Sequence, residues 1–289
     1  MKLYRHQYLL LLLLGLLFLG SSMTSKNTLD IEKRSRVQKD SAQFDLVYSR
    51  EEWRPEQTAL IICDMWDKHW CPTATKRVEE LAPVMDQVVK IAREKGVFII
   101  HAPSDVTDFY DGHPARERAI QAPKSAHLPP EIQSWCYWLD EDEQKSYPID
   151  QSDGGCECEE CSSYKAWSRQ VEAIEIHDSD AISASGVEIW NLMGSRGIQN
   201  VMIMGVHTNM CVLGRPFGLR NMARYGKNVV LIRDLTDTMY NPKSWPYVDH
   251  FTGTDLIIEH IEKYVCPTMT SSALTRQEPF RFKGDNRLR

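Results

Sequence analysis

A thiol in a position suited to nucleophilic chemistry is the clearest chemical feature of the sequence. Residues 205–212 read G-V-H-T-N-M-C-V, where an apolar run ends, the chain turns and a helical pattern begins at about Cys211. The unpaired N–H groups and the dipole at a helix N-terminus stabilise a thiolate, and the same groups can stabilise an oxyanion. A small buried residue that starts a helix would give the same pattern, and for a lone cysteine that structural interpretation is favoured.

A carboxylate at the end of an earlier apolar run supplies a partner for this thiol. Asp64 closes the run T-A-L-I-I-C-D at residues 58–64. A carboxylate near a thiol can act as a general base if burial raises its pKa. The alternative for Asp64 is a helix cap or a loop carboxylate. Taken together, Asp64 and Cys211 indicate a cysteine-dependent active site more strongly than either does alone.

Short apolar runs alternate with helical patterns along most of the chain. We expect strands at residues 58–64, 97–101, 173–176, 200–206 and 228–234, and helices at 77–95, 186–196, 209–225 and 254–264. Strand–helix alternation predicts an α/β fold whose parallel sheet is covered on both faces. Functional sites in such sheets form at the carboxyl ends of the strands, which is where Asp64 and Cys211 fall.

The N-terminus has the composition of an export signal. Basic residues, an apolar run at 8–19 and small residues after it predict a signal peptide over residues 1–22. The run is shorter than the roughly 20 residues that a membrane-spanning helix needs, so we expect no stable membrane span after cleavage. The sequence therefore predicts an exported protein, periplasmic or extracellular, and an uncleaved anchor is the weaker alternative.

The rest of the chain divides by composition. The polar composition of residues 23–42 predicts a flexible tether. We expect residues 43–270 to form one large domain and residues 271–289 to form a C-terminal tail. Within the domain, residues 103–169 are rich in Pro, Trp, Cys and acidic side chains and fit the alternation poorly. We expect an insertion beside the site, because long loops in compact domains are usually functional or disordered. The net charge of −6 and the lack of basic runs argue against a nucleic-acid partner.

Three segments resemble the isochorismatase-like cysteine hydrolases, a family that includes nicotinamidases. Residues 62–70 (I-C-D-M-W-D-K-H-W) are similar to the family's first-strand signature, and residues 205–212 to its nucleophile signature G-x-x-T-x-x-C-V. Residues 231–237 resemble the strand and acidic turn that follow. The resemblance implies a Rossmann-like three-layer sandwich with a mostly parallel six-stranded sheet and helices on both faces. It also implies a homo-oligomer, since the family often forms dimers or tetramers. Together with the predicted signal peptide, the resemblance indicates an exported subgroup of the family.

The resemblance also implies a mechanism. Cys211 would attack a carbonyl to form a thioester, while Asp64 takes the thiol proton and later helps to activate water. The backbone N–H groups of His207 and Cys211 would form the oxyanion hole, with a cis peptide between Val206 and His207. The implied activity is hydrolysis of a small-molecule amide, ureide or ester.

The third catalytic group of the family has no counterpart in the sequence. The family has a lysine at the end of the middle strand, where this chain has His177. His177 could replace that cation, because imidazole titrates near neutral pH, or it could be a surface residue beside a site with two groups. Lys68 and Lys124 are further candidates. Without a lysine, the alternative function is a catalytically inactive exported binding or scaffold protein of the same fold.

Other residues near these motifs have two interpretations each. Trp66, His69, Trp70 and Phe109 have planar faces that suit a planar substrate, or they pack within loops. Arg215 lies on the helix that begins at the thiol and could bind a substrate carboxylate. It could also pair with Asp234 or Asp237, and this structural interpretation is favoured.

Histidine and acidic residues at 101–113 could bind a divalent metal, but their spacing differs from that of nicotinamidases. A polar loop is favoured there, and no cofactor is required. The eight cysteines leave six for pairing if Cys63 and Cys211 stay free, and in an exported protein disulfides are expected. The motif C-E-C-E-E-C at residues 156–161 could bind zinc with a fourth ligand. Disulfides from this motif to Cys71, Cys136 or Cys266 are the favoured alternative.

Overall fold

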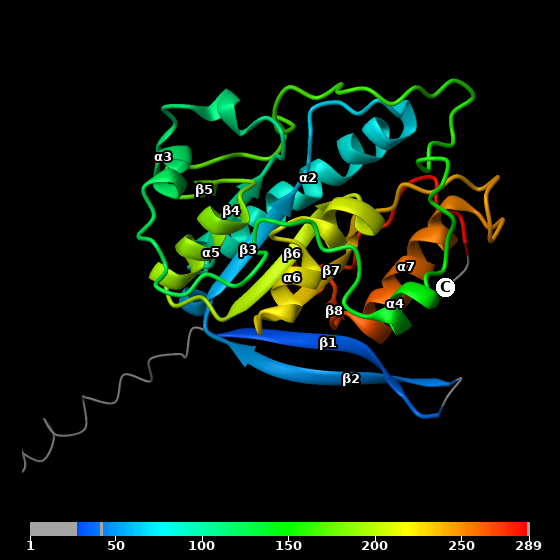
Figure 1. Ribbon diagram of the computed structural model, residues 1–289, viewed down its shortest axis with the longest axis horizontal. Coiled ribbons are helices and arrows are strands. Elements are labelled where there is room, and N and C mark those ends of the chain that lie inside the picture. The colour runs from blue at the N-terminus through cyan, green and yellow to red at the C-terminus, as the bar shows by residue number, and fades with distance from the viewer. Residues whose placement is uncertain (1–27, 41–42, 288–289) are drawn as a thin grey trace, which may run out of the picture.

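An eight-stranded sheet runs through the centre of the molecule (Figure 1) in the computed structural model, which describes residues 28–40 and 43–287. The strands are β1 (Leu29–Gln38), β2 (Phe44–Trp53), β3 (Thr58–Cys63), β4 (Phe98–Ala102), β5 (Ala181–Ile182), β6 (Asn200–Val206), β7 (Asn228–Asp237) and β8 (Thr268–Met269). Their order is β2-β1-β8-β7-β6-β3-β4-β5. Strands β3 to β8 pair in parallel, whereas β1 and β2 are antiparallel. The predicted α/β fold with a mostly parallel sheet is confirmed, with eight strands in place of six.

Helices cover both faces of the sheet because successive strand residues point to opposite sides. The helices are α2 (Pro72–Glu94), α3 (Pro114–Ile120), α4 (Glu141–Lys145), α5 (Gly186–Ser195), α6 (Leu219–Arg224), α7 (His250–Tyr264) and α8 (Ser272–Thr275). In β3, Ala59 and Ile61 pack in one buried cluster with side chains of α5, α6 and α7. Leu60 and Ile62 pack in the opposite cluster with side chains of α2 and α8. This alternation produces the three layers.

The described part of the expected tether is a strand. Residues 29–38 form β1, which pairs with β2 over its whole length and with β8 at one residue, so the prediction of a flexible segment is wrong there. Leu29 and Ile31 are buried on one face of the hairpin. Lys33, although polar, is buried as well and pairs with Glu51 at 2.7 Å. The segment looks like a tether in sequence because its polar residues find their partners in distant segments, such as Glu51 in β2, Asn228 in β7 and Glu262 in α7.

Two expected elements differ from the structure. Residues 173–176 form turns, and the strand beside β4 is β5 instead, at residues 181–182. The helix expected at 209–225 is divided into a π-helical turn, η3 (Thr208–Val212), and α6. Pro216 lies between the two, and a proline has no N–H to continue the helical hydrogen bonds.

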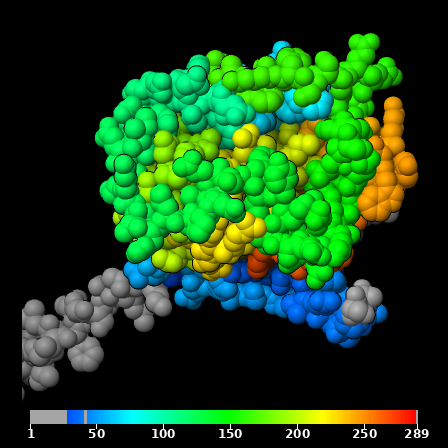
Figure 2. Space-filling view, viewed as in Figure 1, coloured from blue at the N-terminus to red at the C-terminus, as the bar shows by residue number. Residues whose placement is uncertain are grey.

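The insertion at residues 103–169 lies over one face of the molecule, where it appears in green in Figure 2. It contains a 3-10 turn, η2 (Thr107–Tyr110), and the short helices α3 and α4. It is fastened to the segment after the candidate thiol: the Cys136 N–H donates to the Gly214 carbonyl at 2.8 Å, and Glu143 pairs with Arg220 at 2.7 Å. The insertion is therefore part of the folded body.

Part of the expected C-terminal tail is folded, whereas the predicted signal peptide, residues 1–22, lies outside the described residues. Residues 272–275 of the expected C-terminal tail form α8, whose Leu274 is buried, and the Ser271 N–H donates to Asp234 at 2.8 Å. Among the helices of residues 28–40 and 43–287, none has the length and apolar character needed to cross a membrane.

Gly205 lies opposite Cys63 where β3 and β6 pair, and its backbone conformation leaves no room for a side chain there. Gly205 has φ +121°, and a Cβ there would lie 2.0 Å from the Cys63 carbonyl oxygen. We expect Gly205→Ala to lower the free energy of unfolding by at least about 2 kcal/mol, through backbone strain and overpacking. Chemical denaturation measures this change.

Gly194 in α5 is the matched control, since a Cβ there meets nothing within 4 Å. Gly194→Ala should leave stability unchanged or raise it by up to about 1 kcal/mol, because alanine favours helix. Equal midpoints for the two variants would contradict the constraint assigned to Gly205.

Candidate active site

The turn that carries Cys211 is held by hydrogen bonds to the segment at the end of β7. Strand β6 ends at Val206, the Val206–His207 peptide bond is cis as the family resemblance implies, and η3 follows. The Thr208 hydroxyl lies 2.7 Å from that of Thr236, which also donates to the Gly205 carbonyl. The side chain of Asn209 bonds both the N–H and the carbonyl of Met239, each at 2.9 Å. These contacts explain the Thr-Asn pair of the motif: both side chains fix the turn.

Asp64 lies beside Cys211 because their strands are neighbours. Strands β3 and β6 pair in parallel with Cys63 opposite Gly205, so the residues that follow meet at the same edge of the sheet. Asp64 is fully buried and has φ 46°, and its Oδ1 accepts the Ser104 N–H at 2.7 Å. The carboxylate lies close enough to the Cys211 thiol for its charge to raise the pKa of that thiol. The structure therefore brings together the two residues that the sequence singled out.

A guanidinium completes this group. The Arg215 Nε lies 3.3 Å from Asp64 Oδ2, and one terminal nitrogen lies 3.5 Å from Asp105 Oδ2. The Arg215 N–H donates to the Cys211 carbonyl at 3.0 Å, so the two residues are one helical turn apart. The guanidinium also lies 5.5 Å from the centre of the Trp135 ring, which comes from the insertion. The pairing of Arg215 with Asp234 or Asp237 that the sequence favoured is wrong.

The four-residue spacing between Cys211 and Arg215 was the sequence signal for this contact. Side chains four apart on a helix share a face, which brings Arg215 to the thiol's side. The two aspartates expected as its partners are engaged elsewhere: Asp234 accepts from Ser271, and Asp237 pairs with Arg77 at 2.7 Å.

Burial controls the protonation of this group. It raises the pKa of Asp64, and the charge of Arg215 opposes that rise. Burial, followed by the negative charge of Asp64, raises the pKa of Cys211 well above that of an ordinary thiol. Burial acts to lower the pKa of Arg215, but Asp64 and Cys211 outweigh it and keep the guanidinium charged. The site at rest therefore holds a thiol and a carboxyl group whose pKa values are both raised, with the positive charge of Arg215 beside them.

His177 lies apart from this group. Its side chain is 43% exposed and pairs with Glu175 at 3.2 Å, and its N–H donates to Asp180 at 2.8 Å. The prediction of His177 as a replacement for the family lysine is not supported by its position, because residues 173–176 form no strand that would aim it at the sheet edge. Lys68 and Lys124 are exposed as well. Arg215 is the cation that contacts Asp64.

Three of the four aromatic residues proposed to line the site gather near it. Trp66, His69 and Trp167 stack nearly parallel, with Trp66 and Trp167 ring centres 4.2 Å apart, and His69 lies 5.0 Å from Trp70. Trp167 was missed because it belongs to the insertion. Phe109 is separate: it is 55% exposed and packs against Tyr110 and Arg169.

A second group of buried ionisable side chains lies around His207, whose ring centre is 4.8 Å from that of His69. Burial lowers the pKa of both histidines, that of His69 to about 4 and that of His207 well below its usual value, so both rings are neutral. Asp237 is also buried, but the charges of Arg77 and His250 outweigh burial and lower its pKa. Because the His207 ring is neutral, it adds no second positive charge to that of Arg215 near the Cys211 thiol.

The polar side chains of residues 101–113 bind other groups of the protein. The His101 ring bonds Gln170 and Asp180, each at 3.1 Å, and His113 accepts the Ala115 N–H at the start of α3. Asp105 pairs with Arg215. Among the described residues, only Cys71, Cys156, Cys158 and Cys161 form a group of three or more side chains close enough to share an ion.

The cysteines pair differently from the expectation. A disulfide joins Cys156 to Cys161 within the motif itself, so the predicted bonds from the motif to Cys71, Cys136 or Cys266 are wrong. Cys136 and Cys266 are buried among other side chains, and Cys63 is buried in β3. A disulfide was expected, but its partners depend on the path of the insertion, which spacing does not determine.

Solved structures of the isochorismatase family are similar to this chain. One is a cysteine hydrolase from Pseudomonas syringae pv. phaseolicola 1448A, with 17% identity, a TM-score of 0.47, and 78% of this chain and 94% of that chain covered. Another is an isochorismatase family protein from Desulfovibrio vulgaris subsp. vulgaris str. Hildenborough, with 16% identity, a TM-score of 0.44, and 76% and 97% covered. No protein-family model and no curated protein matches the chain. At these identities the likeness concerns the fold.

The charges around Cys211 predict opposite effects of two substitutions on its pKa. Asp64→Asn removes a charge that raises the pKa, so the Cys211 pKa should fall. Arg215→Gln removes a charge that lowers it, so the pKa should rise. Each change should be at least about one pH unit, as expected for a charge within contact distance. The rate of iodoacetamide alkylation of the Cys211 peptide, measured against pH, reports both.

Glu175→Gln is the control, because Glu175 is an exposed carboxylate outside the group. Its alkylation profile should match that of the unmodified protein. Shifts in the same direction for Asp64→Asn and Arg215→Gln would contradict the electrostatic assignment.

Proposed function

We propose that this protein is a cysteine-dependent hydrolase that cleaves a small amide, ureide or ester through a thioester on Cys211. One observation supports this above all others: the buried Cys211 thiol lies beside the buried side chain of Asp64, which is itself bound by Arg215. A purely structural cysteine needs no carboxylate, and an isolated buried carboxylate is costly. The position of the group at the carboxyl ends of adjacent parallel strands supports the same proposal.

In the first half of the reaction, the Cys211 sulfur attacks the substrate carbonyl carbon while Asp64 takes the thiol proton. The proton then passes to the leaving nitrogen or oxygen, the C–N or C–O bond breaks, and a thioester remains. A raised pKa suits Asp64 to this role, because a base with a pKa nearer to neutral can both accept and return a proton. We assign oxyanion stabilisation to the backbone N–H groups of His207 and Cys211, by resemblance to the family.

In the second half, Asp64 takes a proton from water as that water attacks the thioester carbonyl. The C–S bond breaks, the acid product leaves, and the thiol regains its proton from Asp64. Arg215 keeps a positive charge beside Asp64 through both halves. We propose that it supplies the cation that a lysine supplies in the family, from the helix after the nucleophile.

Substrate recognition in this proposal involves the stacked aromatic residues. Trp66, His69 and Trp167 present planar faces near the site, which would favour a flat, small substrate. Trp66 is held by its Nε1, which donates to the Ser104 carbonyl at 3.1 Å. The predicted signal peptide makes export of the hydrolase part of the proposal.

Turnover of a panel of small amides, ureides and esters tests the proposal. For any compound cleaved, Cys211→Ala should lower kcat by at least about 10³-fold, because the nucleophile is lost. Arg215→Lys should retain more activity than Arg215→Met, since it keeps a charge near Asp64. His177→Ala should stay within about twofold of the unmodified protein, as its exposed side chain lies outside the group.

A hydrolase that keeps its rate in Cys211→Ala would contradict the proposed nucleophile. Absence of turnover across the panel, together with a Cys211 thiol that iodoacetamide does not modify at any pH, would favour the alternative of an inactive binding or scaffold protein. Thermal unfolding of every variant separates loss of chemistry from loss of fold.

A further inference from the structure

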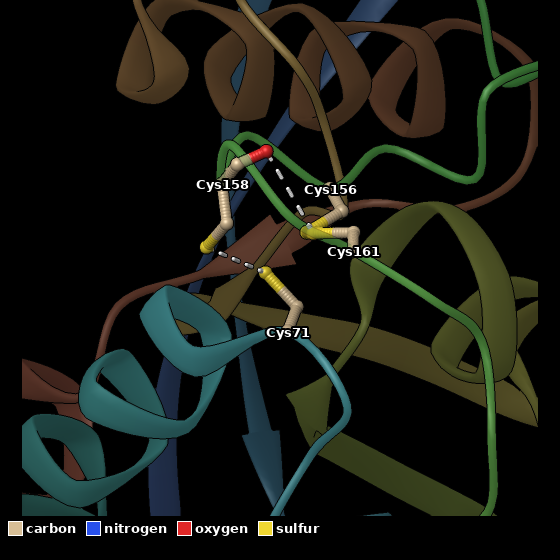
Figure 3. A group of neighbouring side chains, drawn as sticks. All are labelled: Cys71, Cys156, Cys158 and Cys161. Carbon is tan, nitrogen blue, oxygen red and sulfur yellow. Dashed lines mark hydrogen bonds between the residues drawn. A yellow bond between two sulfur atoms is a disulfide. The ribbon is translucent and has the colours of Figure 1, made fainter.

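Four cysteine sulfurs lie together where the insertion meets the start of α2. All four sulfur atoms, of Cys71, Cys156, Cys158 and Cys161, are within 4.8 Å of one another. Figure 3 shows Cys71 at the first turn of α2 facing Cys158, with the Cys156–Cys161 disulfide beside them. The Cys71 and Cys158 sulfurs are 3.9 Å apart and not bonded. These four residues are called the cysteine cluster below.

We propose that the cysteine cluster binds one zinc ion through four thiolates when its disulfide is reduced. A tetrahedral zinc site has Zn–S bonds of about 2.3 Å, which places its sulfurs about 3.8 Å apart. The observed separation of Cys71 and Cys158 matches that edge. The spacing C-x-C-x-x-C with a fourth cysteine from another element also supplies the closed ligand set typical of structural zinc sites.

The N-terminus of α2 supplies a second argument. Cys71 is the N-cap and Pro72 follows at the first helical position, so the first free N–H groups belong to Thr73 and Ala74. Both the Cys71 sulfur and the Cys158 sulfur lie within 3.5 Å of the Thr73 hydroxyl in this first turn. Free N–H groups and the dipole at a helix N-terminus stabilise thiolates nearby, and the thiolate is the form that binds zinc.

The Thr73 hydroxyl lies close to both of these sulfurs. It is 3.5 Å from the Cys158 sulfur and 3.2 Å from the Cys71 sulfur, so it can donate a hydrogen bond to either one.

The residues between the cysteines fix the motif independently of a metal. Glu157 points into the protein, where it pairs with Arg77 and lies 3.7 Å from the His250 ring. Gly155 packs so closely on the Met239 carbonyl that a Cβ would lie 2.3 Å from its oxygen. Glu159 and Glu160 are exposed, so water screens their repulsion of a thiolate site.

The disulfide and zinc forms exclude each other, because the disulfide uses two of the four ligands. A dithiol or phosphine reductant would supply two electrons and two protons would be taken up, giving thiols at Cys156 and Cys161. Binding of Zn²⁺ would then release the four thiol protons. The zinc ion would link the insertion to the start of α2 at Cys71, two residues after His69. The redox state of the cysteine cluster would thereby be coupled to the stacked aromatic residues.

Metal analysis of the full-length protein tests this proposal. Protein expressed with added zinc and purified with a phosphine reductant should contain one zinc per chain by plasma mass spectrometry. X-ray absorption should show four sulfur ligands at about 2.3 Å. Cys71→Ser and Cys158→Ser should lose the bound zinc, because three thiolates bind far more weakly than four.

Cys266→Ser is the matched control, since Cys266 is a buried free thiol outside the cluster, and it should keep the full zinc content. Cobalt added to the reduced, metal-free protein provides a check that needs no variant, through its thiolate charge-transfer absorption. Reduced protein with neither zinc nor this absorption would overturn the proposal, as would full zinc retention in Cys158→Ser. Both readouts measure metal alone, so they stand or fall separately from the hydrolase proposal.

Discussion

The close approach of β3 and β6 at Gly205 is the constraint on which the candidate site depends. The two strands pair with Cys63 opposite Gly205, and the space that a side chain would need is occupied by the Cys63 carbonyl. Because the two strands are direct neighbours in the sheet, Asp64 and the turn that carries Cys211 lie side by side at its edge. The thiol and the carboxylate are then neighbours although they are far apart in the sequence.

A buried carboxylate at that point creates a need for charge balance. Taking Asp64 out of water is costly, and Arg215 offsets the cost through an ion pair that is itself shielded from solvent. The insertion holds this guanidinium through Asp105 and the ring of Trp135. The long insertion is therefore an essential part of the site's electrostatics, and its Trp167 also completes the aromatic stack.

The sequence predicts the parallel part of this architecture well because buried strands are continuous apolar runs. Residues 58–64 and 200–206 are of this kind, and both strands and their terminal residues fall where expected. Such reasoning does not detect the β1–β2 hairpin, since its polar side chains pair across the hairpin and with residues of β7 and α7 that are distant in sequence. Arg215 and Trp167 show the same limit: their roles follow from contacts between distant segments. His177 was one of two open alternatives for the position of the family lysine, and the strand expected before it does not form.

Direct detection of the acyl-enzyme tests the central claim, that Cys211 is a nucleophile activated by Asp64. The protein is mixed with a small activated ester such as p-nitrophenyl acetate, quenched in acid within milliseconds to seconds, and digested for peptide mass spectrometry. At a pH at which Cys211 is protonated in both the unmodified protein and Asp64→Asn, the account predicts one acetyl group, on the peptide containing Cys211, that forms more slowly in Asp64→Asn and is lost in Cys211→Ala. An acetyl group on another residue during turnover, or the same adduct at an unchanged rate in Asp64→Asn, would contradict it.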